Sequence, residues 1–112
     1  MSIHCEEYNG VCVMSVNGDF AGDDAAQARK HAEGLIDHRQ LVDFVIDLER
    51  APFVDSQGLE AMLWIKRKCE DLFGQIKLAG AGEGVRKILE MTRLSHRFEC
   101  AADVPTALKT MR

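Results

Sequence analysis

The sequence predicts an α/β domain that begins with a β-hairpin and continues as alternating strands and helices. The turn-forming pair Asn9-Gly10 separates two short runs of β-compatible residues. Beyond residue 20, runs of alternating apolar residues take turns with segments of helical periodicity. The chain has 112 residues, of which 46% are hydrophobic, and this suits a single domain over residues 1–112. Parallel strands need right-handed crossovers, so we expect a mixed, mainly parallel sheet.

The first predicted element is a hairpin of Ile3–Tyr8 and Val11–Val16, because Asn-Gly tolerates the two positive φ angles of a type I′ turn. A helix follows, which we expect to end near Arg39. Asp23 and Asp24 stand where an N-cap and an acidic first turn favour that helix. Its apolar residues recur at helical spacing and are Ala25, Ala28, Ala32, Leu35 and Ile36.

Residues Val42–Leu48 are predicted to form a strand with one clearly apolar face. Val42, Phe44, Ile46 and Leu48 share that face, whereas Asp43, Val45 and Asp47 lie on the other. A parallel strand covered on both faces would be apolar almost throughout. We therefore expect the helices to pack chiefly on one face of the sheet.

A second helix is predicted to open at Asp55-Ser56 and to stop at Gly74, a residue typical of the C′ position. Trp64 falls on its polar side, together with Glu60, Arg67 and Asp71. The opposite stripe is apolar and comprises Gly58, Met62, Ile65, Cys69, Leu72 and Phe73. A short strand, Gln75–Ala79, is expected next.

The C-terminal third is predicted to contain two helices and a short edge strand, Phe98–Cys100. Asp103 is placed to cap the last helix, with Pro105 in its first turn. The third helix turns Val85, Ile88, Leu89 and Thr92 to one face, and the last turns Ala107, Leu108 and Met111 inward.

Composition argues against nucleic-acid and membrane roles. Fourteen basic and eighteen acidic residues give a net charge of −4, and the densest basic cluster, Lys66-Arg67-Lys68, is followed after one residue by Glu70 and Asp71. The longest apolar run, Ala61–Ile65, is too short for a membrane span, and the N-terminus lacks a secretory pattern. We expect a cytoplasmic location and free thiols at Cys5, Cys12, Cys69 and Cys100, a Cys5–Cys12 bridge being the alternative.

The patterns of an enzyme or a metal site are not evident in the sequence. Gly80-Ala81-Gly82-Glu83-Gly84 follows a strand, yet its spacing matches no phosphate-binding loop, and Glu83 would repel an anion. Ser56 stands in no nucleophile elbow. The four histidines, His4, His31, His38 and His96, show no metal-ligand spacing. We expect a non-enzymatic protein without a cofactor; a small-ligand or nucleotide-binding module is a less favoured alternative.

The segment from Val42 to Leu59 joins a strand to Asp-Ser-x-Gly-Leu at the opening of a helix, and it resembles the STAS domain family. This family is shared by sulfate transporters and bacterial anti-sigma factor antagonists. Gly18-Asp19-Phe20 and Lys77-Leu78-Ala79-Gly80 also fall where the family places comparable residues, so the resemblance covers nearly the whole chain. It implies the STAS fold, an N-terminal hairpin leading into a β/α superhelix.

The resemblance implies a regulatory module that binds an anti-sigma factor or a serine-kinase-like ATPase. In phosphorylated members the acceptor directly precedes the motif glycine, and here that position is Gln57. Ser56 is a possible alternative phosphosite, and Ala21 stands where such members often have Asp. Because glutamine cannot be esterified, we expect no phosphorylation control at this position.

The predicted partner surface is Asp55, Ser56, Gln57, Gly58, Leu59, Glu60 and Trp64. Asp55 and Ser56 are equally well explained as helix caps, and Gly58 by a close helix–strand approach. Burial of Trp64 against a loop or in a homodimer contact is the alternative to an interface anchor. A further alternative is the cytoplasmic STAS subunit of a phospholipid ABC transporter, since Ser56-Gln57 resembles the residues of that group.

Overall fold

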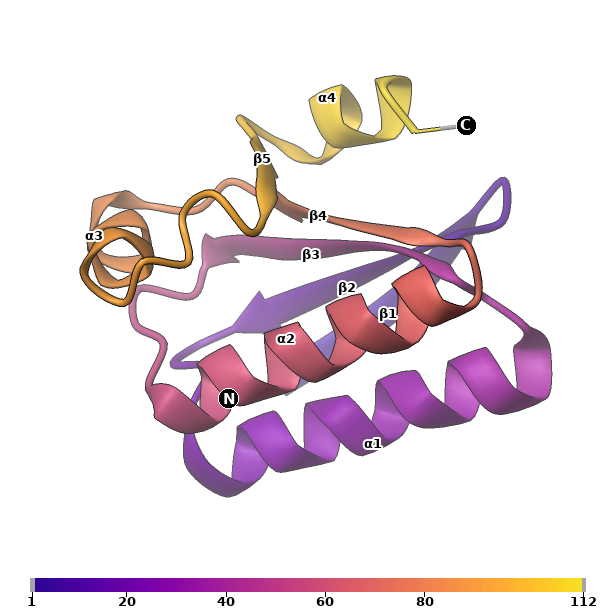
Figure 1. Ribbon diagram of the computed structural model, residues 1–112, viewed down its shortest axis with the longest axis horizontal. Helices are drawn as coiled ribbons and strands as arrows, with labels where there is room; N and C mark the ends of the chain where they lie inside the picture. The colour runs from indigo at the N-terminus through magenta and orange to yellow at the C-terminus, as the bar shows by residue number, and fades with distance from the viewer. Residues whose placement is uncertain (1, 112) are drawn as a thin grey trace.

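The protein folds around one five-stranded sheet, in the strand order β1-β2-β3-β4-β5 (Figure 1). The computed structural model describes residues 2–111. β1 and β2 pair antiparallel, and the remaining neighbours pair parallel. The elements in chain order are β1 (Ser2–Tyr8), β2 (Val11–Asn17), α1 (Gly22–Arg39), β3 (Asp43–Arg50), α2 (Ser56–Asp71), β4 (Gln75–Ala79), α3 (Glu83–Met91), β5 (Glu99–Ala101) and α4 (Val104–Lys109). The predicted hairpin and β/α alternation are confirmed.

The helices divide unequally between the two faces of the sheet. Figure 1 shows α1 and α2 side by side on one face, α4 on the other and α3 at one end of the sheet. The main core lies under α1 and α2, and a smaller cluster lies under α4. The smaller cluster consists of Val11, Val13, Val45, Ala79, Ala107 and Met111. The prediction of helices chiefly on one face is confirmed.

The register of β3 explains its mixed sequence. Phe44, Ile46 and Leu48 are buried in the main core, as predicted. The two aspartates are half-buried on the other face and accept backbone hydrogen bonds: Asp43 Oδ1 from Gln75 N at 3.1 Å and Asp47 Oδ1 from Glu49 N at 3.0 Å. Backbone N–H groups therefore supply hydrogen bonds to these two carboxylates, which α4 covers only in part.

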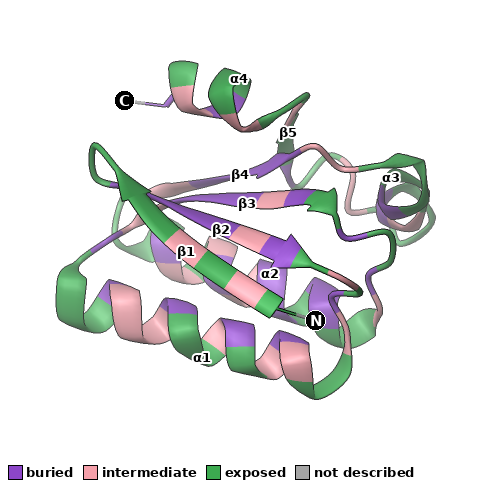
Figure 2. Ribbon diagram, turned by 180° about the vertical axis from the view of Figure 1, so that it is seen from behind, coloured by how far each residue is buried: buried purple, intermediate pink, exposed green. Residues whose placement is uncertain are grey.

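The hairpin turn has the geometry that its sequence predicts. Asn9 and Gly10 take φ angles of 53° and 84°, and Tyr8 pairs with Val11 across the turn. Figure 2 shows that β2 is buried along most of its length, whereas β1 alternates between exposed and partly buried residues. β1 is thus an edge strand with one half-covered face.

The end of α2 corrects the predicted apolar stripe. Gly58, Met62, Ile65 and Cys69 are buried, but Leu72 and Phe73 are 47% and 99% exposed. Phe73, not Gly74, takes the left-handed C′ position, with φ at 65°. The N–H of Phe73 bonds to Glu70 O and that of Gly74 to Cys69 O, which is a Schellman motif. Gly74 is needed because a Cβ there would lie 1.9 Å from Val42 O.

Smaller differences affect other boundaries. The residue that caps α1 is Ala21, and Asp23 and Asp24 lie in the first turn rather than at the cap. β5 begins one residue later than predicted, and Thr92 is an exposed C-cap whose hydroxyl donates to Ile88 O at 2.8 Å. Asp103 caps α4 as predicted, accepting from Thr106 N at 2.9 Å.

The described part of the chain holds no helix with the length and hydropathy of a membrane span. Its four cysteines are free thiols.

Candidate functional site

The first turn of α2 is held by one carboxylate that bonds in two directions. Asp55 Oδ1 accepts from Gly58 N at 2.9 Å, which caps α2. Its other oxygen, Oδ2, accepts from Gly22 N at 3.1 Å, at the first residue of α1. Asp55 therefore fixes the starts of both helices relative to each other, which is more than the capping role its sequence position predicts.

Gly58 lets α2 sit directly against the connection between β2 and α1. A Cβ at this position would lie 2.1 Å from Phe20 O and 2.8 Å from Val54 Cγ1. Phe20 and Val54 form an isolated parallel bridge, and Phe20 N donates to Phe53 O at 2.9 Å. The predicted close-approach role of Gly58 is confirmed, with a loop connection in place of a regular strand.

The predicted partner residues separate into a buried and an exposed group. Gly58 and Leu59 are buried, and Asp55 is half-buried. Ser56, Gln57 and Glu60 are exposed on the first two turns of α2. The exposed side chains are thus available to a visiting molecule, while their neighbours hold the helix in place.

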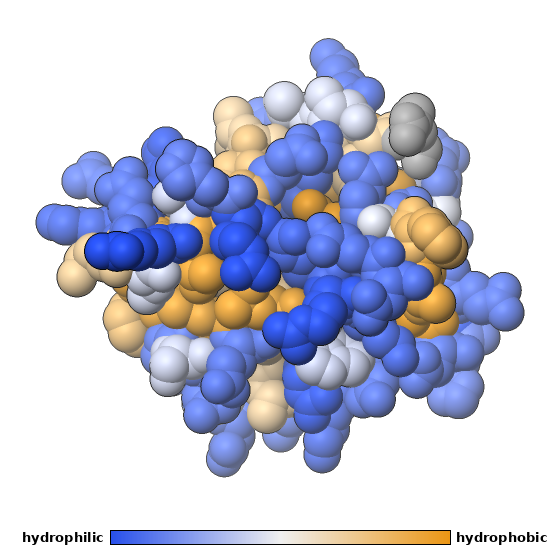
Figure 3. Space-filling model, in the orientation of Figure 1, coloured by the Kyte–Doolittle hydropathy of each residue, from blue (hydrophilic) through white to orange (hydrophobic). Residues whose placement is uncertain are grey.

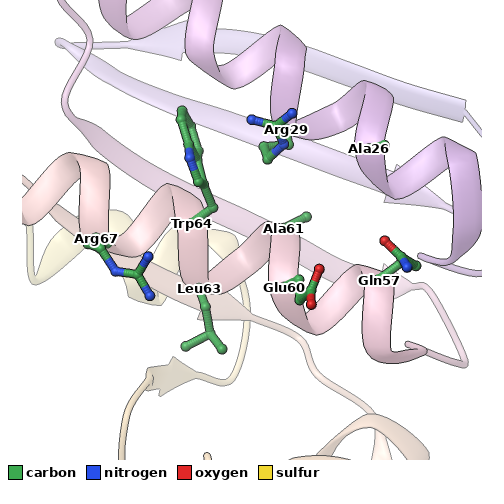
Figure 4. A pocket seen from close by; sticks show the side chains of 8 residues that line it. All are labelled: Ala26, Arg29, Gln57, Glu60, Ala61, Leu63, Trp64 and Arg67. Carbon is green, nitrogen blue, oxygen red and sulfur yellow. The ribbon is translucent and has the colours of Figure 1, made fainter.

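A groove between α1 and α2 joins the exposed first turn to Trp64. It encloses about 370 Å³ and is lined by Gln57, Glu60 and Trp64 from α2 and by Arg29 from α1, among others. In Figure 4, Trp64 points toward α1, Arg29 projects into the same gap, and Leu63 points away from it. The groove brings together three of the predicted partner residues, Gln57, Glu60 and Trp64, which lie three and four positions apart along α2.

Trp64 is less exposed than its place on the polar side of α2 predicts. Its side chain is half-buried and packs against the main core. The Arg29 guanidinium lies 5.2 Å from the ring centroid and the Lys68 ammonium 5.9 Å, both within cation–π range. The packing of α1 on α2 covers part of the ring, and this tertiary contact corrects the prediction.

Arg29 is a charged groove residue that the sequence analysis did not single out. It lies on α1, a helix whose sequence pattern predicts only a core-facing stripe of apolar residues. Its Nη1 lies 3.9 Å from Glu33 Oε1, one turn along the same helix. Nothing local marks Arg29, since its position over Trp64 depends on how the two helices pack.

The surface around the groove is mainly hydrophilic. Figure 3 shows apolar surface on this face in two areas, one between α2 and α3 and one near the turn that follows α2. Leu72 and Phe73 form that turn. A partner that binds the groove would therefore meet a polar rim with apolar surface beyond it.

The possible metal ligands and the thiols of the described residues are spread over the fold. Within residues 2–111 no group of three or more His, Cys, Asp or Glu side chains is arranged to hold a metal ion. A hydrogen bond with Cys5, together with burial, raises the pKa of Cys12, and burial raises the pKa of Cys69 to about 12. These thiols stay protonated near neutral pH and are poor nucleophiles. In the glycine-rich connection after β4, Gly80 N donates to Ala101 O at 3.0 Å.

Comparison with known proteins agrees with this fold. The family model of the STAS domain matches residues 2–107, so the chain belongs to the STAS domain family. Among curated proteins, none matches the sequence closely enough to count as a relative.

Several solved structures share the fold. An anti-sigma factor antagonist from Mycobacterium paratuberculosis is 23% identical with a TM-score of 0.86, covering 99% of this chain and 93% of that one. The Bacillus cell fate determinant SpoIIAA, in its phosphorylated form, is 20% identical with a TM-score of 0.81, covering 99% and 100%. A sulfate transporter family protein from Wolinella succinogenes is 19% identical with a TM-score of 0.75, covering 91% and 84%. At these identities the likeness establishes the fold.

Proposed function

We propose that this STAS domain is a non-enzymatic regulatory module of the cytoplasm that acts by binding another protein. Its docking surface is the exposed first turn of α2 and the groove that runs from there to Trp64. The partner is an anti-sigma factor or a serine-kinase-like ATPase. Membership of the STAS family and fold neighbours described as anti-sigma factor antagonists support a role in protein association.

The observation that carries this proposal is the exposure of Gln57 and Glu60 at the mouth of a groove. Gln57 is uncharged, so it can be desolvated against a partner at far lower cost than a phosphate or a carboxylate. The orphan N–H groups of the helix start are partly used by Asp55, which holds the docking turn rigid before binding. Position 57 thus keeps the surface permanently in a form that a partner can bind.

The binding test substitutes a charge at this position. Gln57→Glu retains the size of the side chain and places a negative charge on the docking turn. We expect roughly tenfold weaker binding to the purified partner, measured by calorimetry. Gln40→Glu is the matched control, because Gln40 is exposed at the end of α1 and lies outside the groove. Equal affinities of both variants and the wild type would place the interface elsewhere.

The phosphorylation test uses the cognate kinase. The wild type should remain unmodified after incubation with kinase and ATP, whereas Gln57→Ser should gain one phosphate, located by mass spectrometry. This gain-of-function variant shows whether the kinase engages the site at all. Stoichiometric phosphate on Ser56 of the wild type would contradict the proposal of a partner surface free of this control.

A second candidate role is that of the STAS subunit of a phospholipid ABC transporter, favoured by the order Ser56-Gln57 in the motif. Affinity purification from the native cell distinguishes the two roles. A histidine-kinase-like ATPase among the captured proteins supports the first, and transporter ATPase and permease subunits support the second.

A further inference from the structure

The outer edge of β1 is open. In the sheet order β1 is the first strand, and among residues 2–111 it pairs only with β2. In Figure 2, β1 lies in front of the sheet, and no other strand runs along its outer side. An open edge of this length offers a row of backbone donors and acceptors to another strand.

The turn geometry identifies which residues of β1 point their backbone groups outward. Tyr8 and Val11 flank a two-residue turn and therefore form a hydrogen-bonded pair. Because hydrogen-bonded and non-hydrogen-bonded pairs alternate, Glu6 and His4 also bond to β2. The N–H and C=O groups of Ile3, Cys5 and Glu7 consequently face away from the sheet.

These three residues are spaced for pairing with a second copy of the same strand. In a two-fold antiparallel arrangement centred on Cys5, Cys5 pairs with Cys5 of the second copy, and Ile3 pairs with Glu7. All of these are outward-facing residues, so each pair exchanges two backbone hydrogen bonds. Centring the strands on Glu7 would shorten the overlap and oppose two Glu7 carboxylates.

The same register places complementary side chains opposite each other on the exposed face of β1. It sets His4 of each copy directly opposite Glu6 of the other, at a non-hydrogen-bonded pair where side chains lie closest. Both side chains are accessible, at 72% and 54% exposure, and within one chain His4 Nε2 already lies 3.6 Å from Glu6 Oε2. Glu7 has an ion-pair partner within its own chain, since Arg39 Nη2 lies 3.0 Å from Glu7 Oε1.

The helix-facing side of β1 leaves apolar atoms for such a partner to cover. Ile3 and Cys5 are only half-buried there. A hollow of about 230 Å³ lies between β1 and α1, lined by Ile3, Gln27 and His31, among others. A second copy along β1 would close the open side of this hollow.

We propose that this chain forms a symmetric homodimer through antiparallel pairing of β1 with β1 of a second copy, in the register that sets His4 opposite Glu6. The two sheets then become one continuous sheet. The surface is separate from the groove between α1 and α2, so the dimer does not depend on the proposed partner-binding function.

Charge exchange at the strand tests the register. Wild-type protein should dimerise as its concentration rises in sedimentation equilibrium. His4→Glu places two Glu–Glu pairs across the interface and should raise the dimer Kd roughly tenfold. The double variant His4→Glu with Glu6→Lys restores opposite charges and should return the Kd to within about threefold of the wild type.

The matched controls carry the same changes away from β1. His96→Glu, alone and with Glu90→Lys, alters exposed residues near α3 and should leave the Kd unchanged. A monomeric wild type at concentrations of about 1 mM would overturn the proposal. So would a dimer whose Kd responds equally to His4→Glu and His96→Glu, or a double variant that stays as weak as His4→Glu.

Cross-linking at Cys5 provides an independent readout. In a Cys100→Ser background, Cys5 is the remaining thiol that is not buried. A short bismaleimide should then yield a covalent dimer, which Cys5→Ser abolishes and His4→Glu diminishes. A strand from a different protein at this edge would give no such product, and that result would also refute the homodimer.

Discussion

Gly58→Ala measures how closely α2 must approach the connection between β2 and α1. The new Cβ would lie 2.1 Å from Phe20 O and 2.8 Å from Val54 Cγ1, so the backbone must separate by more than about 1 Å. Overpacking of this kind costs about 1–3 kcal/mol, and the shift also strains the hydrogen bond from Phe20 N to Phe53 O, worth about 1 kcal/mol. The higher helix propensity of alanine offsets about 1 kcal/mol of this loss in the free energy of unfolding. We expect a net loss of about 2 kcal/mol in the free energy of unfolding.

Gly34→Ala is the matched control, because Gly34 lies within α1 and a Cβ there meets nothing within 4 Å. Helix propensity alone then applies, and we expect a gain of about 0.5–1 kcal/mol. Urea unfolding followed by the fluorescence of the single tryptophan, Trp64, measures both variants. A Gly58→Ala protein as stable as the wild type, or stabilised like Gly34→Ala, would refute the close-approach argument.

Three further changes test other contacts. Lys77 is buried under α4, where its Nζ donates to Thr110 Oγ1 and lies 3.4 Å from Glu99 Oε2. Lys77→Met keeps the volume of the side chain and should preserve or raise the urea midpoint. Lys77→Ala should lower the free energy of unfolding by about 2 kcal/mol, because it leaves a cavity. Phe73→Gly should raise the free energy of unfolding by about 0.5–1 kcal/mol, because Phe73 is exposed and held at a positive φ; a decrease would show that the ring makes a stabilising contact. Hydrogen bonds from Thr106 lower the pKa of Asp103 below its ordinary 3.8. The ionised carboxylate therefore contributes its full stabilisation of the fold above pH 3.8, and this contribution is lost as the pH falls through the folded pKa. Asp103→Asn should flatten this part of the acid-unfolding profile, and an unchanged slope would contradict the capping role of Asp103.

Local chemistry predicted the features that depend on a few neighbouring residues. Asn9-Gly10 specifies its turn because few other pairs accept two positive φ angles. Asp55 and Asp103 cap their helices because a carboxylate on the extended residue before a helix reaches the N–H three residues along the chain. The alternation in β3 predicted its two faces for the same reason, since the period of a strand is a property of the backbone.

The candidate site was predicted only in part. The motif located the exposed turn at Ser56 and Gln57, but not the groove, because the groove has a second wall on α1. Arg29 and Trp64 are 35 positions apart in the sequence and meet only when the two helices pack. The helical wheel places Trp64 on the polar side of α2, and the packing of the two helices decides that its side chain is nevertheless half-buried.

The sequence by itself determined the hairpin turn at Asn9-Gly10, the capped starts of α2 and α4, and which side of β3 faces the core, because these follow from backbone geometry and from residues in local contact. Only the tertiary structure decided that Asp55 also binds Gly22, that Phe73 leaves the core and that Trp64 lies under Arg29. Each of these depends on the distance between elements far apart in the chain. That distance is set by the packing of all the elements together, which no short segment encodes.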